Sequence, residues 1–132
     1  MRIFLAGSSS AISDELGWLI DGMAGFDVSI CGQLNSDETI KAIIEMQPDI
    51  ILLDVHMDHD RGFDVLRTVK TKLTNTKTIA LVNALSLQHR IMCQALDIDY
   101  FLDKRTELYK IPNLLSRILL RNQHRELAGE VA

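Results

Sequence analysis

Short apolar strands and amphipathic helical segments alternate five times along this chain of 132 residues. Each apolar run has the length of a buried strand, and the segment after it repeats its apolar residues at helical spacing. The expected strands are Arg2 to Ala6, Phe26 to Ile30, Asp49 to Leu53, Thr78 to Val82 and Tyr100 to Leu102. Strict alternation of this kind predicts an α/β fold, in which parallel strands are joined by right-handed crossovers and helices cover both faces of the sheet.

The helical segments between these strands carry their own start and stop signals. The first begins near Ser10, and the second begins at Ser36 with acidic residues in its first turn and stops before Pro48. The other helices are expected around the apolar stripes of residues 63–69, 87–96 and 108–119, and the last of them tolerates Pro112 only within its first turn. The length fits a single domain.

Charge and cysteine content limit the class of protein. The formal net charge is -4 at pH 7, whereas a surface that binds nucleic acid needs clustered cations, so we expect no direct contact with nucleic acid. Cys31 and Cys93 lie outside any metal-ligand spacing, which favours reduced thiols in a cytoplasmic protein. The chain has no apolar run of membrane-spanning length and begins directly in a strand, so we expect neither a signal peptide nor a membrane partner.

Asp54 is the first candidate for chemistry. It ends the apolar run from Ile50 to Leu53, and Gly62 opens the next amphipathic segment eight positions later. In an open α/β sheet, strand ends and helix starts converge on one crevice, where ligands collect. The position therefore favours a functional carboxylate, although a carboxylate that only caps a turn is the alternative.

Two stretches of the chain resemble one known family, the receiver domains of bacterial two-component response regulators. Asp54-Val55-His56-Met57-Asp58-His59-Asp60-Arg61-Gly62 resembles the phosphoacceptor strand and loop of these domains, and Tyr100-Phe101-Leu102-Asp103-Lys104 resembles their fifth strand with its site lysine. The resemblance covers nearly the entire chain. It implies a flavodoxin-like fold with five parallel strands in the order 2-1-3-4-5 and five helices, a receiver domain over residues 1–125 and a C-terminal tail over residues 126–132.

The resemblance also implies roles for two residues. Asp54 would accept a phosphoryl group from a histidine kinase or a histidine phosphotransfer protein, and Lys104 would face the charge of that group. Most lysines at strand ends are merely solvated, but the string before Lys104 favours the site. A module of this kind is a switch and not a multiple-turnover enzyme.

The expected switch departs from the family pattern at two positions. Asn83 ends the fourth strand, where the family usually has a hydroxyl residue, and an amide can donate to a phosphoryl oxygen but is larger and planar. Phe101 occupies the aromatic switch position and lacks the phenolic hydroxyl that is often found there. Both substitutions are expected to weaken or retune the coupling between phosphorylation and output.

The expected metal site departs further from the family. Gly7 and Ser8 align with the acidic pair that holds Mg²⁺ after the first strand. Mg²⁺ wants anionic oxygen ligands, and Asp54 with the backbone carbonyl of His56 would be nearly alone, so we expect Mg²⁺ to bind weakly if it binds at all. Residues 58–60 form a solvated acidic loop by default, with replacement metal ligands as the alternative.

Two helices offer candidate partner surfaces. Trp18 lies away from the apolar stripe of the first helix, so it is either an exposed aromatic contact or half-buried against a neighbour. The last helix has an apolar stripe wider than one sheet face requires, which includes Leu115 and Leu119, and this favours a homodimer.

Three functions remain open from the sequence. The leading interpretation is a receiver module of a phosphorelay that is phosphorylated on Asp54 and then changes its partner binding. The second is a receiver-like module that binds a protein without phosphorylation, which the missing acidic pair makes credible. The third, a small flavodoxin-like binding protein or enzyme, shares the fold class but lacks a glycine-rich phosphate loop and a nucleophile–base pair.

Overall fold

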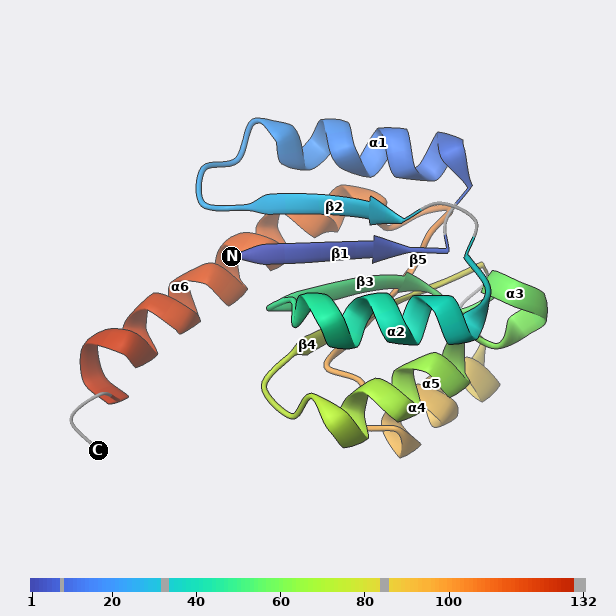
Figure 1. Cartoon of the computed structure of the whole chain (residues 1–132). Coiled ribbons are helices and arrows are strands. Elements are labelled where there is room, and N and C mark those ends of the chain that lie inside the picture. Colours follow the sequence, from blue (N-terminus) through green and yellow to red (C-terminus); the bar gives the residue numbers. More distant parts are fainter. Residues whose placement is uncertain (8, 32–33, 84–85, 130–132) are drawn as a thin grey trace.

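A computed structural model of the chain describes residues 1–129 except 8, 32–33 and 84–85. Among these residues, five strands form one parallel sheet in the order β2-β1-β3-β4-β5, and the arrowheads of β1 and β2 in Figure 1 point the same way. The strands are β1 (Arg2–Ala6), β2 (Asp27–Cys31), β3 (Ile50–Asp54), β4 (Lys77–Val82) and β5 (Tyr100–Asp103). The predicted fold class and strand order are confirmed.

Helices flank the sheet on both faces (Figure 1). Within the described residues they are α1 (Ser10–Asp21), α2 (Ser36–Met46), α3 (Met57–Asp60), α4 (Gly62–Lys72), α5 (Leu87–Ala95) and α6 (Ile111–Gly129), with the 3-10 turn η1 (Leu108–Lys110) before the last. The short helix α3 raises the number above the five that we expected. Helix α6 continues past residue 125, and the division there into domain and tail stays a prediction.

Each strand places alternate side chains on opposite faces of the sheet, so the chain has two apolar layers. Helices α1 and α6 bury one layer, in which Leu16 and Leu115 pack with Ile3 and Leu52. Helices α2, α4 and α5 bury the other. All five residues of β3 are buried, because this strand lies at the centre of the sheet and is covered on both faces. The end of β3, with Asp54, is therefore buried like the rest of the strand.

Local sequence explains where the helices begin. The side chain of Ser9 caps α1 by accepting from the backbone of Ile12. At α2 the cap is Asn35, which forms a reciprocal capping box with Glu38. The helix begins at Ser36, as predicted, and this residue is buried. Pro112 lies in the first turn of α6, as predicted.

Candidate functional site

Asp54 and Lys104 meet at the carboxyl-end edge of the sheet. Asp54 ends β3, and Lys104 directly follows β5. The Lys104 Nζ atom lies 2.6 Å from Asp54 Oδ2, and the side chains are 18% and 5% exposed. A carboxylate buried to this extent needs a charged partner or strong hydrogen bonds, because water no longer solvates it. The structure thus brings together the two residues that the sequence singled out.

Backbone hydrogen bonds fix this pair in place. The amide of Val55, the residue after Asp54, donates to Leu81 O, and the amide of Lys104 donates to Val82 O. These two bonds hold the backbone on both sides of the pair to the end of β4. The second carboxylate oxygen of Asp54, Oδ1, accepts from the backbone N–H of His56 at 2.9 Å. Among the described residues, Asp54 therefore has one ammonium and one amide as its donors, one on each oxygen.

His56 bridges two loops of the site with its side chain. Its Nε2 atom accepts from the backbone N–H of Asn83 at 3.0 Å, so this nitrogen carries no proton and Nδ1 carries it. The Nδ1 atom lies 2.9 Å from Asp60 Oδ1 and donates to it. The sequence predicts only a loop residue whose backbone carbonyl could face a metal, and the spacing of four residues to Asp60 is the signal for the side-chain role.

The two expected switch residues belong to the neighbouring strand ends, Asn83 directly after β4 and Phe101 on β5. Asn83 follows β4, its side chain is exposed, and its backbone N–H makes the contact with His56. Phe101 is half-buried on β5, with the Arg90 guanidinium carbon 6.0 Å from its ring centroid. The ring is thus held between the sheet and α5.

The loop after β3 follows an unusual path. Its residues Asp58, His59 and Asp60 all have positive φ angles, between 45° and 64°, which side-chain-bearing residues seldom adopt. The Oδ2 atom of Asp58 accepts from the backbone N–H of Ser36 at 2.7 Å, and this bond lowers the pKa of Asp58 below its ordinary value. The bond to Ser36 helps to offset the strain of this backbone.

Glycines at two positions allow this loop to pack closely. A Cβ atom on Gly62 would lie 2.3 Å from Val55 Cα, which explains the glycine at the start of α4. Gly7 has a φ of 79°, and a Cβ atom there would lie 2.5 Å from the Cβ of Met57. Met57 itself is buried. The side chain of Met57 therefore packs against Gly7, the position at which the family has the first residue of its acidic pair.

The described residues of this edge offer few of the anionic oxygen ligands that Mg²⁺ prefers. Gly7 has no side chain, and Ser8 lies outside the described residues. Asp58 turns toward Ser36 and Asp60 toward His56, so neither joins Asp54 as a replacement ligand. Across the described part of the chain, no three His, Cys, Asp or Glu side chains are grouped to hold a metal. The oxygens of Asp54 already face Lys104 and an amide.

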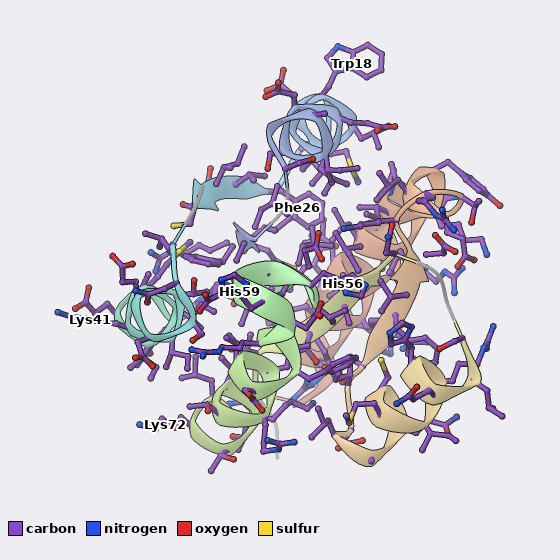
Figure 2. All side chains as sticks on the ribbon, turned by 90° about the vertical axis from the view of Figure 1, so that its right-hand side faces the viewer. Trp18, Phe26, Lys41, His56, His59 and Lys72 are labelled. Atoms are coloured by element: carbon purple, nitrogen blue, oxygen red, sulfur yellow. The ribbon has the colours of Figure 1, made fainter. Side chains whose placement is uncertain are left out.

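Figure 2 looks onto this edge of the molecule, with His56 near the middle of the view and Trp18 pointing outward from α1. Trp18 is 81% exposed, so of the two alternatives the exposed one holds. Leu119 is half-buried and lines a shallow pocket with Phe26 and Leu120. Leu115 is fully buried in the core, and the prediction that it belongs to a partner surface is wrong. The sheet covers more of the apolar stripe of α6 than its sequence pattern indicated.

Two further observations concern the buried cysteine Cys93 and the length and polarity of the helices. Burial raises the pKa of the Cys93 thiol to about 11, so this cysteine is not a thiolate nucleophile at neutral pH. Among the described residues, each helix is too short or too polar to span a bilayer.

Comparisons with known proteins agree with this geometry. Residues 3–116 match the sequence model of the family described as Response regulator receiver domain. The transcriptional regulatory protein YvfU of Bacillus subtilis is 30% identical over 82 residues, which are 61% of this chain and 40% of that protein. The sensory transduction protein LytT of Bacillus cereus is 24% identical over 104 residues, 77% of this chain and 41% of that protein.

A solved structure supports the fold. The CheY-like response regulator receiver domain protein of Methanospirillum hungatei superposes with a TM-score of 0.75 at 19% identity, covering 95% of both chains. The chain spans about two fifths of the length of the curated relatives that it matches. Since the family match extends over most of the sequence, the chain belongs to the response regulator receiver domains, the signalling modules of two-component systems.

Proposed function

We propose that this receiver domain accepts a phosphoryl group on Asp54 and thereby changes its binding to a protein partner. The observation that carries the proposal is the contact between Asp54 Oδ2 and Lys104 Nζ, 2.6 Å apart at a buried strand end. A transferring phosphoryl group spreads negative charge over its oxygens, and a fixed ammonium stabilises that charge strongly where water is excluded. Lys104 is suited to this role because the backbone holds it to β4.

The phosphodonor is a phosphohistidine of a histidine kinase or of a histidine phosphotransfer protein. A carboxylate oxygen of Asp54 attacks phosphorus, the P–N bond breaks, and the electron pair leaves with the imidazole nitrogen of the donor. The product on this chain is an acyl phosphate, which replaces one carboxylate charge with the larger charge of a phosphoryl group. Water exclusion around Asp54, which is 4% exposed, slows its hydrolysis.

We expect Mg²⁺ to contribute little to this transfer. Where the family has its first acidic ligand, this chain has Gly7 packed against Met57, and Lys104 is the cation in contact with Asp54. Mg²⁺ releases its water only for several well-placed oxygen ligands. Binding is therefore expected to be weak, and we assign no step of the transfer to the ion.

Intact-mass measurement tests the proposal. The protein is incubated with acetyl phosphate and, separately, with a histidine-phosphorylated transfer protein, each with Mg²⁺ and with a chelator. We expect a mass gain of one phosphoryl group in all four mixtures. Asp54→Asn should abolish the gain, whereas the matched change Asp58→Asn, four residues along the same loop, should retain it. A folded wild-type chain that gains no mass from either donor would contradict the proposal.

A second candidate function is a binding module that works without phosphorylation. The packing of Met57 against Gly7 and the 81% exposure of Trp18 favour it. A large aromatic side chain that stands free on a surface is a typical anchor of a protein interface. For this function we expect no mass gain on Asp54. The protein should still bind a kinase, a transfer protein or a second copy, and Trp18→Ala should weaken that binding.

We also propose that α1 and α6 form the surface for a second copy. Trp18 lies on α1, and Leu119 and the 64% exposed Leu120 lie on α6. Light scattering over a range of concentrations measures the mass. Loss of a concentration-dependent increase in Leu120→Lys would support a dimer, and a mass of one chain at all concentrations would exclude it.

A further inference from the structure

His56 touches both the acceptor and the end of β4, with different atoms. Its backbone N–H donates to Asp54 Oδ1 at 2.9 Å, and its ring nitrogen Nε2 accepts from the backbone N–H of Asn83 at 3.0 Å. One residue therefore connects the carboxylate of β3 to the chain that leaves β4. The connection does not use the side chain of Asn83.

Contacts with Asp60, Asn83 and His89 position the ring of His56. Nδ1 lies 2.9 Å from Asp60 Oδ1, which keeps the proton on Nδ1 and leaves Nε2 to accept from the Asn83 N–H. The ring of His89 on α5 makes an edge contact at 5.7 Å between centroids. With its side chain 31% exposed, His56 lines an open pocket of about 260 Å³ together with Phe63 and Met92. These contacts restrain the orientation of the ring.

We propose that His56 is the positioning residue that couples the state of Asp54 to the position of Asn83. This inference rests on the proposed phosphorylation of Asp54. An acyl phosphate on Asp54 changes the charge and size of the group that the His56 amide faces, and the imidazole carries the resulting shift to the Asn83 amide. The coupling therefore uses an imidazole and a backbone N–H in a chain that has no hydroxyl side chain at position 83.

Two substitutions separate the two hydrogen bonds of the ring. In His56→Asn the side-chain amide nitrogen takes the place of Nδ1, so the bond to Asp60 is kept and the bond from Asn83 is lost. In His56→Gln the amide oxygen takes the place of Nε2, so the bond from Asn83 is kept. Each variant is thus the control for the other, and Asp60→Ala leaves His56 present but removes the restraint on its proton.

The first arm of the test uses the unphosphorylated protein. Nitrogen NMR of the wild type should show His56 protonated on Nδ1. Hydrogen exchange of the Asn83 amide should be about five- to tenfold faster in His56→Asn than in the wild type, near the wild-type rate in His56→Gln, and intermediate in Asp60→Ala. Equal exchange in the wild type and in a folded His56→Asn would overturn the inference, whether or not Asp54 is ever phosphorylated.

The second arm measures the coupling itself. Phosphorylation of the wild type should shift the Asn83 amide resonance, and the shift should persist in His56→Gln and disappear in His56→Asn while both still gain the phosphoryl mass. A full shift in His56→Asn would overturn the coupling. If the wild type gains no phosphoryl group, the proposed function fails, and the exchange rates of the first arm alone decide on the His56 bridge.

Discussion

Two carboxylates paired with lysines lie at opposite ends of the sheet and are held very differently. At the amino end of β5, Asp99 Oδ2 accepts from the backbone N–H of Thr78 at 2.8 Å and from its hydroxyl at 3.1 Å, with Lys70 Nζ at 3.4 Å. At the carboxyl end of β3, Asp54 has one ammonium and one amide. Asp99 is nevertheless the more exposed side chain, at 22% against 5%.

From this difference we infer that Asp99 holds the fold and that Asp54 is available for chemistry. Several donors converge on one oxygen of Asp99, and they join α4, β4 and β5. Within the described part of the chain Asp54 has fewer donors than Asp99, so burying its charge is less well compensated. We therefore expect substitutions at Asp99 to affect folding and substitutions at the Asp54 pair to affect phosphoryl transfer.

The largest expected effect is on transfer. Lys104→Met removes the ammonium that faces Asp54, and the rate of phosphoryl acceptance should fall about 100-fold or more, as for other fixed groups that stabilise transition-state charge. Rates are measured by quantifying the phosphorylated mass over time. The matched change Lys70→Met, at the other pair, should leave the rate unaltered. Equal rates in wild type and Lys104→Met would break the distinction.

The next effect is on stability. Asp99→Ala leaves the Thr78 amide without its acceptor in a residue that is 0% exposed, and the free energy of unfolding should fall by about 2 kcal/mol. Urea unfolding measures it. Asp54→Ala should cost less, because Lys104 can extend its ammonium to water. The reverse order of the two costs would show that Asp54 is the structural carboxylate.

A smaller effect is expected at Gly7. Gly7→Ala places a side chain at a φ of 79° and against Met57, so the free energy of unfolding should fall by about 1 to 2 kcal/mol. Adding Met57→Gly removes the Cβ atom that the new side chain would meet, but it does not remove the backbone strain. The double variant should therefore be more stable than the sum of the two single costs predicts, as measured by a double-mutant cycle. Additive costs would mean that Met57 does not limit the space at Gly7.

The smallest effect concerns Asp58, a third carboxylate, whose pKa the amide of Ser36 lowers from an ordinary 3.8. A carboxyl whose pKa is lower in the folded chain adds stability above its unfolded pKa and loses it as pH falls through the folded value. Asp58→Asn should therefore reduce the acid dependence of the melting temperature below about pH 4. An identical acid dependence in both proteins would show that the bond to Ser36 does not persist in solution.

Much of the fold is readable from local pattern. Apolar runs of strand length that alternate with helical stripes predicted the parallel sheet. Since parallel strands end at one edge, Asp54 and Lys104 were expected at the same place although 50 residues separate them. Helix starts were less certain, because several neighbouring polar residues can cap a helix. Asn35 and not Ser36 caps α2, since Glu38 completes a box with it.

The packing around the site was not readable in the same way. The contact between Met57 and Gly7 joins residues of different loops, and no spacing rule relates them. The same holds for the bond between His56 and Asn83. Leu115 was misassigned because a wide apolar stripe does not say how much of it the sheet covers, whereas Trp18 lies outside the stripe and is exposed.

The sequence by itself determined the order of strands and helices and the placement of an acid and a lysine at two strand ends, because both follow from the period of side chains along regular elements. Only the tertiary structure decided which groups surround Asp54. Loop paths depend on close contacts, such as that between Gly7 and Met57, where a Cβ atom on Gly7 would lie only 2.5 Å from the Cβ of Met57. They also depend on long-range hydrogen bonds, such as that from the Asn83 amide to His56. Such contacts depend on three-dimensional packing, which has no repeat along the chain.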